Sequence, residues 1–202
     1  MLATQPFKQA LADFKQQRGA LRMAEALRLG ISRRVLYALR DAGVIEQVSR
    51  GFYRLTELPA LSNPDLTLVA AHMPNAVICM VSALAFHNLT TQVPHAVDVA
   101  LQRGARRSRL AFPPTNVYWF SGASFAEGIE THTIDGINVR VYDPEKTVVD
   151  VFRYRNKIGM DVALEALQRW RQQRKGKFNV LMAYARMRSV EKTLAPYLAV
   201  PL

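Results

Sequence analysis

The segment from Ser32 to Leu55, SRRVLYALRDAGVIEQVSRGFYRL, limits the possible folds of this chain more than any other segment does. In its first half, Val35, Leu36 and Leu39 fall on one face of a helix. Ser32 is suited to cap that helix, because its hydroxyl can accept a hydrogen bond from a free backbone N–H. The pattern therefore predicts an amphipathic helix that begins directly after Ser32.

The second half of the segment has the composition of a β-hairpin. Strand-forming residues at 44–48 and 52–55 flank the turn sequence Ser49-Arg50-Gly51, in which the glycine can adopt a positive φ. Phe52 and Leu55 do not share a face under strict alternation, so the sequence leaves the register of the hairpin open.

Two more helices are expected before this segment, at 7–14 and 21–29, and a turn of three residues joins the second of them to the helix after Ser32. Helices followed by a hairpin in this order are typical of a winged helix-turn-helix domain. We therefore predict such a domain, with duplex DNA as its partner, over residues 1–58.

The predicted third helix and the hairpin carry the candidate DNA contacts. Arginine matches phosphate oxygens and guanine edges with its planar fork, and a helix fits the major groove. An amphipathic helix with arginines on a merely solvated face is the ordinary alternative. The candidate residues are Ser32, Arg33, Arg34, Tyr37, Arg40, Arg50 and Arg54.

The composition agrees with a basic, folded protein. Half of the 202 residues are hydrophobic and the formal net charge is +11, which suits a protein that binds nucleic acid or a membrane surface. No apolar run is long enough to span a bilayer, and the first residues lack the pattern of a signal peptide. The single cysteine, Cys79, excludes an internal disulfide and a cysteine-based zinc site. We expect a cytoplasmic protein.

The charge is distributed unevenly along the chain. Residues 1–60 contain ten cationic and five acidic residues, a net charge of +5. Residues 61–150 have a net charge of −2, and residues 151–202 one of +8. A nearly neutral middle region therefore separates two basic ends.

After a proline-containing linker at 57–64, the pattern predicts a second domain over residues 65–202. A β-hairpin is indicated by Asp135-Gly136, because this dipeptide supplies the positive φ angles of a type I′ turn. Asp143 and Pro144 have the positions of an N-cap and a first helical residue. The fold class expected for the whole chain is α+β, in which the winged domain is followed by a mixed α/β domain with a small sheet and a helical C-terminal tail. The expected strands are 76–80, 96–101, 115–120, 129–134 and 137–142, and the expected helices are 65–72, 82–88, 144–155, 160–174, 178–187 and 190–198.

The sequence contains no strong candidate for a catalytic, cofactor or metal site. Neither glycine-rich phosphate-binding motif occurs, and the four histidines lack the spacing of metal ligands. Ser82 is better explained as a helix cap than as a nucleophile, and Cys79, between apolar residues, as a buried thiol. Asp143, Glu145 and Asp150 could form a metal-binding set.

Each of these carboxylates also has an ordinary structural explanation. Asp143 can cap a helix, Glu145 lies in the first helical turn, and Asp150 can pair with Arg153 or Lys146. We therefore predict no catalytic residue, metal or cofactor, and a protein that is not an enzyme.

Two further basic segments could form a second basic surface. One is a loop between predicted strands and the other surrounds Trp170 near the end of the chain. They are either solvated charges or contacts to phosphate or to an acidic partner. Their cationic residues are Arg103, Arg106, Arg107 and Arg109 in the loop, and Arg169, Arg171, Arg174, Lys175 and Lys177 near Trp170.

Three stretches together resemble the AbiEi-like antitoxins of type IV toxin–antitoxin (abortive infection) systems. These are GISRRVLYALRDAGVIEQVSRGFYRL, PNAVICMVSAL and VRVYDPEKTVVDVF, and the resemblance extends over roughly residues 10–170. It implies a winged domain that binds promoter repeats and represses its own operon. It also implies a C-terminal domain that counteracts a nucleotidyltransferase-like toxin without forming a stable complex with it.

The sequence leaves two other functions open. The chain could be a free-standing winged-helix regulator whose second domain binds a small effector. Less well supported is a metal-dependent RNA-processing enzyme that uses Asp143, Glu145 and Asp150. A homodimer on DNA is expected if the operator is an inverted repeat.

Overall fold

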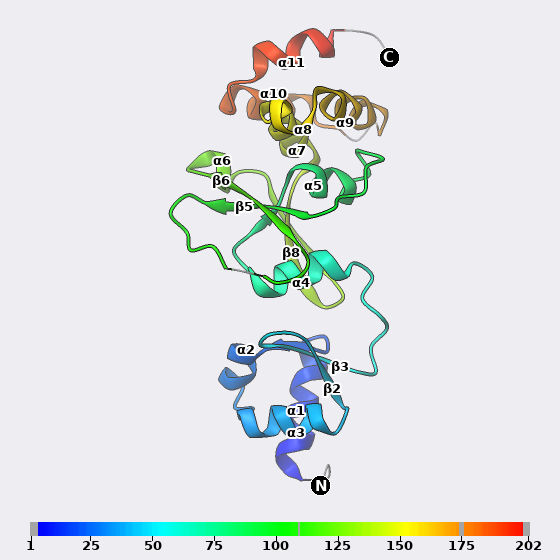
Figure 1. The fold of residues 1–202 in the computed structure, drawn as a ribbon, viewed down its shortest axis with the longest axis vertical. Coiled ribbons are helices and arrows are strands. Elements are labelled where there is room, and N and C mark those ends of the chain that lie inside the picture. The colour runs from blue at the N-terminus through cyan, green and yellow to red at the C-terminus, as the bar shows by residue number, and fades with distance from the viewer. Residues whose placement is uncertain (1–3, 109, 174–175, 200–202) are drawn as a thin grey trace. The chain divides into compact units, whose positions relative to one another are not determined.

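A computed structural model describes residues 4–108, 110–173 and 176–199. The chain divides into two compact units (Figure 1). The first unit comprises the chain up to Pro74 together with Thr133–Val139, and the second comprises Asn75–His132 and the chain from Arg140 onward. The linker expected at 57–64 thus lies inside the first unit.

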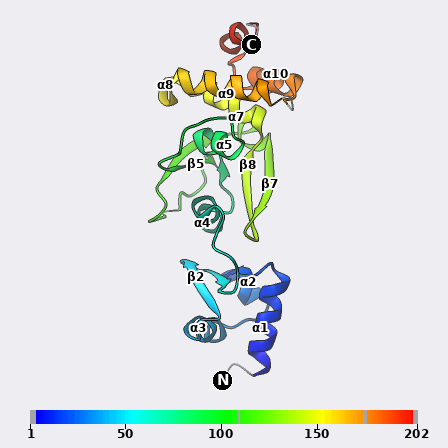
Figure 2. The ribbon, with the colours of Figure 1, turned by 90° about the vertical axis from the view of Figure 1, so that its right-hand side faces the viewer.

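The first unit combines four helices with a small antiparallel sheet of strand order β1-β3-β2. Figure 2 shows α1 and α3 side by side, with the sheet beside them. The elements are α1 (Gln5–Gln16), β1 (Ala20–Arg22), α2 (Met23–Arg28), α3 (Arg33–Asp41), β2 (Ile45–Ser49), β3 (Phe52–Leu55) and α4 (Pro64–His72).

The prediction of a helix at 21–29 was wrong for its first two residues. Leu21 and Arg22 belong to strand β1, where Leu21 is opposite Tyr53 in β3. Helix α2 begins only at Met23, because the carboxylate of Glu25 accepts a hydrogen bond from the backbone N–H of Arg22, 3.0 Å away. Strand β1, the third strand of this sheet, was not predicted from the sequence.

The hairpin contains an irregularity that explains its ambiguous pattern. Its register shifts between Gln47 and Ser49, so that Ser49 is opposite Phe52. An extra residue in one strand changes the face on which later side chains lie. In addition, β3 is the central strand and all four of its residues are buried, including both Phe52 and Leu55.

Helix α4 belongs with the first unit because polar contacts hold it there. The guanidinium of Arg22 donates a hydrogen bond to the carbonyl oxygen of Ala70, 2.6 Å away. The side chain of Asn63 caps the helix by accepting from the N–H of Leu66 at 3.3 Å. The contact with Arg22, together with the packing of α4 on β2, places this helix against the sheet of the first unit.

A five-stranded mixed sheet of order β6-β5-β4-β8-β7, followed by helices, belongs to the second unit except for Thr133–Val139 around the β7–β8 turn. Strand β5 pairs antiparallel with β4 and parallel with β6, while β4 pairs parallel with β8. The elements are β4 (Val77–Ile78), α5 (Met80–Phe86), β5 (Val97–Gln102), β6 (Thr115–Phe120), α6 (Ala123–Ala126), β7 (Ile129–Ile134), β8 (Ile137–Tyr142), α7 (Pro144–Arg153), α8 (Arg155–Ile158), α9 (Met160–Gln172), α10 (Phe178–Met187) and α11 (Glu191–Leu198).

Several predicted elements are confirmed with their bounds. Strands 115–120, 129–134 and 137–142 are observed as β6, β7 and β8, and the helix 178–187 as α10. Asp135 and Gly136 have φ angles of +50° and +82°, as a type I′ turn requires. Helix α7 ends two residues earlier than expected, and the short helix α8 follows it. None of the helices in the described part of the chain is long and apolar enough to cross a membrane.

The expected role of Ser82 as a helix cap was wrong, because α5 begins before it. The carboxylate of Asp98, in β5, accepts a hydrogen bond from the N–H of Val81 at 3.0 Å and so satisfies the start of α5. Ser82 is buried, and its hydroxyl accepts from the N–H of Asp98 at 2.9 Å. The amide of Asn116 in β6 donates to the other carboxylate oxygen of Asp98 at 2.9 Å. One buried carboxylate thus joins α5, β5 and β6.

Candidate nucleic-acid interface

Helix α3 is fixed by its cap and by its apolar face. The hydroxyl of Ser32 accepts a hydrogen bond from the N–H of Val35 at 3.3 Å, as the sequence predicts. Leu36 and Leu39 are fully buried in the core of the first unit, while Val35 is partly buried beside it. The opposite side of the helix is consequently held toward solvent.

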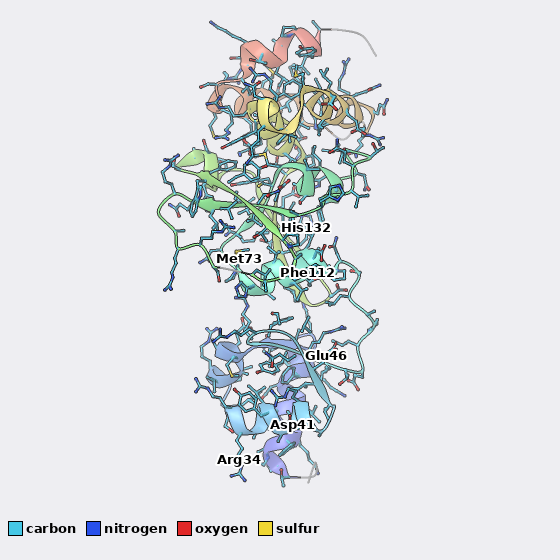
Figure 3. All side chains as sticks on the ribbon, in the orientation of Figure 1. Arg34, Asp41, Glu46, Met73, Phe112 and His132 are labelled. Carbon is cyan, nitrogen blue, oxygen red and sulfur yellow. The ribbon has the colours of Figure 1, made fainter. Side chains whose placement is uncertain are left out.

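The first turn of that exposed side carries two cations. Arg33 and Arg34 are both exposed, and the side chain of Arg34 extends away from the ribbon (Figure 3). Within the described residues, neither forms an ion pair. Arg50 is exposed at the turn of the hairpin and likewise has no ion-pair partner there. These three guanidiniums are available to an anionic ligand.

Arg40 differs from them because it is engaged on the protein surface. Its guanidinium lies 2.8 Å from a carboxylate oxygen of Asp41 and 5.0 Å from the ring centroid of Tyr37. The hydrogen bond to Asp41 raises the pKa of Arg40. Tyr37 is 40% exposed, so the aromatic ring is accessible. An anion that binds Arg40 must compete with Asp41.

The expectation that Arg54 lies near the surface of the hairpin was wrong. Arg54 is 5% exposed, because β3 is the central strand of the sheet and is covered on both faces. Its guanidinium donates to a carboxylate oxygen of Glu46 at 3.2 Å and to the carbonyl oxygen of Pro59. Arg54 therefore holds the chain after the hairpin, and its remaining donor, Nε, is buried without a hydrogen-bond partner among the described residues and is shielded from solvent.

The three carboxylates that could form a metal-binding set, those of Asp143, Glu145 and Asp150, accept hydrogen bonds from donors of the chain itself. Asp143 caps α7 through the N–H of Lys146 at 2.7 Å and also accepts from the hydroxyl of Tyr184 at 2.8 Å. Glu145 accepts from the indole N–H of Trp170 at 3.2 Å and from the backbone N–H of Lys177 at 2.7 Å.

Asp150 forms a buried network with two cations. It pairs with Lys146, one of the two partners predicted from the sequence, and with Arg188, whose Nε lies 2.6 Å from the carboxylate. Lys146 and Asp150 are completely buried, and burial lowers the pKa of Lys146. The Lys146 ammonium also lies 4.2 Å from the ring centroid of Tyr142. No sequence signal pointed to Arg188, because it is 38 residues away from Asp150.

The described residues contain no group of three or more histidine, cysteine or acidic side chains arranged to hold a metal ion. Cys79 is buried as expected, and burial raises the pKa of its thiol. Nε2 of His87 lies 2.7 Å from the carbonyl oxygen of Tyr142, and that of His132 lies 3.1 Å from a carboxylate oxygen of Glu130.

The two additional basic segments have different structures. Arg103, Arg106 and Arg107 are exposed in the loop between β5 and β6. Near the C-terminus, by contrast, Trp170 is buried, and Arg169 donates to Glu165 at 2.8 Å. Arg171 is partly buried, Lys177 is exposed, and Arg109, Arg174 and Lys175 lie outside the described residues.

Comparisons with known proteins found a family match within the first unit and a solved structure of similar fold. Residues 9–56 match a family described as "Transcriptional regulator, AbiEi antitoxin", which confirms the resemblance over that segment. The crystal structure of the RV2827C protein from Mycobacterium tuberculosis is similar in fold, with a TM-score of 0.57 and 14% sequence identity. The similarity covers 95% of this chain and 72% of that protein. A search of curated proteins found no significant match.

Proposed function

We propose that this chain is a DNA-binding antitoxin that represses its own operon. In this proposal the first unit is a winged helix-turn-helix domain, with α3 as the recognition helix and the β2–β3 hairpin as the wing. The order of helices and strands and the antiparallel sheet β1-β3-β2 support it. The family match over residues 9–56, which contains all of these elements from β1 to β3, supports it as well.

The observation that carries the proposal is the pair of exposed guanidiniums at the start of α3. In helix-turn-helix proteins the N-terminal residues of the recognition helix face the base edges of the major groove. Arg33 and Arg34 occupy that position and form no ion pair within the described residues. Arg50 would contact the phosphate backbone from the wing, and Tyr37 would pack against sugar or a thymine methyl group.

Arg40 and Ser32 have supporting roles in this proposal. Arg40 would exchange Asp41 for a phosphate, since the present pair is exposed and exposed pairs contribute little energy. Ser32 would fix the first turn of α3 and leave its backbone N–H groups directed toward the DNA.

For the second unit we propose a regulatory rather than a catalytic role. The carboxylates that a metal-dependent reaction would require already accept hydrogen bonds from the chain itself. The unit would counteract a nucleotidyltransferase-like toxin without a stable complex. Action on promoter DNA would place the protein in the cytoplasm, and an inverted-repeat operator would bring two copies together.

The proposal is tested with an Arg33→Ala/Arg34→Ala double variant of the full chain. The probe is a labelled duplex from the region upstream of the gene, titrated by fluorescence anisotropy at several salt concentrations. Each lost phosphate contact should make the slope of log affinity against log salt less negative by about 0.9. We therefore expect a change of up to about 1.8 in slope and a loss of affinity of about tenfold or more.

The matched control is Arg153→Ala/Lys192→Ala, which removes the same charge from exposed positions in the second unit. It should keep the affinity and slope of the unmodified chain. Equal affinities and slopes for the α3 variant and the unmodified chain would remove α3 from the interface. Equal losses in both variants would show binding by net charge alone.

A further inference from the structure

The five-stranded sheet ends in an edge strand that lacks the usual protection. Strand β6 is paired on one side only, and its parallel register with β5 is continuous from Thr115 to Phe120. Its sequence, TNVYWF, contains no charged residue, proline or glycine. Natural edge strands are commonly protected by charges, prolines or bulges, because their free N–H and C=O groups can pair with another chain.

The opposite edge of the same sheet shows that protection. Strand β7 carries Glu130 and His132, whose side chains form a pair at 3.1 Å. The difference between the two edges indicates that β6 remains open for a ligand. We propose that β6 is a docking edge for an extended, acidic segment of a partner protein, which adds to the sheet as a further strand.

The side chains of β6 fit such a role. On one face, Tyr118 and Phe120 are 6% and 2% exposed and anchor the strand in the core. On the other face, Trp119 is 38% exposed. A partly exposed tryptophan beside ordered backbone groups is a common anchor for a bound peptide, and a strand that is already ordered loses little entropy on binding.

The charge beside the edge selects the partner. Arg103, Arg106 and Arg107 are exposed in the loop that connects β5 to β6, which extends from the sheet in Figure 1. Within the described residues, none of the three forms an ion pair. A second copy of this chain carries the same net charge of +11, so two copies would repel rather than attract each other at this edge. Opposite charge is therefore required of the occupant.

Backbone pairing favours a peptide over a nucleic acid at this edge. A strand offers alternating N–H and C=O groups, and an extended peptide satisfies both kinds. A phosphate backbone has acceptors but no donors for the free carbonyl groups. This inference is independent of the DNA-binding function proposed for the first unit.

The test uses the full chain and a fluorescein-labelled peptide of alternating glutamate and threonine, about ten residues long. Binding is followed by anisotropy, and the bound complex by hydrogen exchange of the backbone amides at 115–120. We expect saturable binding with added protection of the alternate amides that face the free edge, because the others already face β5. N-methylation of alternate peptide amides, which keeps the charge but blocks strand pairing, should weaken binding by about tenfold or more.

Two protein variants separate the contributions of charge and of the edge. The triple variant Arg103→Gln/Arg106→Gln/Arg107→Gln and the single variant Trp119→Thr should each weaken the peptide by about tenfold. The charge-matched control, Arg153→Gln/Arg186→Gln/Lys192→Gln, changes exposed residues of the same unit and should bind within about twofold of the unmodified chain. Melting temperatures establish that each variant is folded.

Three results would overturn the proposal. One is the absence of binding by the acidic peptide. Another is equal binding of the N-methylated peptide, which would show attraction by charge alone. The third is protection of amides 115–120 by a single-stranded oligonucleotide of equal charge to the same degree as by the peptide, which would assign the surface to nucleic acid.

Discussion

Helices α3 and α7 begin in the same way, yet the arginines of α3 are exposed to solvent and the ion pair of α7 is buried in the protein. Each starts after a capping side chain, Ser32 in α3 and Asp143 in α7. The arginines of α3 point to solvent, whereas Lys146 and Asp150 of α7 are completely buried. Similar amphipathic sequences have therefore been placed in two very different electrostatic environments.

The difference follows from the number of neighbouring elements. Helix α3 packs on α1 and β2 and keeps one face free. Helix α7 is contacted by α5, α9, α10 and α11, so Lys146 and Asp150 have no route to water. A charge in the first setting is available to a ligand, while a charge in the second must be neutralised by the protein itself. Charge in a sequence therefore indicates a binding surface only where packing leaves a free face.

The largest test of this comparison is Asp150→Ala. The change leaves Lys146 and Arg188 without their shared carboxylate inside the protein. Removal of one partner from a buried ion pair typically costs about 3–5 kcal/mol. We expect a loss of that size in the free energy of unfolding, measured by urea denaturation of the full chain.

Glu127→Ala serves as the control, because this exposed carboxylate forms no ion pair within the described residues. It should change the free energy of unfolding by no more than about 0.5 kcal/mol. A loss below about 1 kcal/mol for Asp150→Ala would contradict the comparison, since it would mean that water reaches the two cations.

The second test compares two arginines of one hairpin. Arg54→Ala removes a buried guanidinium and leaves the carbonyl of Pro59 without its donor, so we expect a loss of about 1–3 kcal/mol in unfolding free energy. Arg50→Ala should leave stability within about 0.5 kcal/mol and weaken binding to the upstream duplex. Denaturation and anisotropy of both variants give the comparison, which fails if Arg54→Ala weakens DNA binding without loss of stability.

The third test concerns the cap of α3. Ser32→Ala removes the acceptor for the N–H of Val35 and should lower the free energy of unfolding by about 1 kcal/mol. Ser32→Asp keeps a capping oxygen but adds a negative charge at the proposed DNA contact. We expect it to retain stability in thermal denaturation and to lose affinity for the duplex. A variant that retains both would show that the start of α3 does not face DNA.

The smallest test is a dependence on pH near α7. His87 contacts the carbonyl of Tyr142, the residue before the Asp143 cap, and burial lowers the pKa of His87. As the pH falls below about 6.5, the unfolded chain takes up the proton first, so the stabilisation present at neutral pH is lost progressively. His87→Gln keeps an N–H donor but does not titrate.

The relevant measurement is the difference in unfolding free energy between the unmodified chain and His87→Gln from pH 8 to pH 5. This difference should be constant above about pH 7. Below about pH 6.5 the unmodified chain should lose unfolding free energy relative to the variant. The contribution of other titrating groups cancels in this difference. Parallel curves over the whole range would show that His87 titrates equally in the folded and unfolded states.

Local signals predicted much of the fold. Asp135-Gly136 located the hairpin β7–β8 with its bounds, since a type I′ turn depends only on adjacent residues. The Ser32 and Asp143 caps were found for the same reason. The exposed position of Arg33 and Arg34 followed from the helical spacing of their apolar neighbours.

Features that depend on distant residues were missed. Strand β1 is recognisable only through its pairing with β3, because its three residues also fit the start of a helix. Arg54 was placed on the surface because alternation in a strand does not reveal that both faces are covered. Arg188, likewise, is brought to Asp150 only by the packing of the C-terminal helices.

The carboxylate of Asp98 couples the side chains at two positions, 98 and 116, in evolution. It accepts hydrogen bonds from the start of α5 and from Asn116, while its own N–H donates to Ser82. A substitution at any one of these sites leaves a buried polar group without its partner, so single changes are selected against. In relatives that have diverged at this junction, positions 98 and 116 should therefore have changed together, and an alignment deep enough to measure covariation should detect them as a coupled pair, whereas position 82, which contacts only the backbone of residue 98, should vary independently of the side chain there.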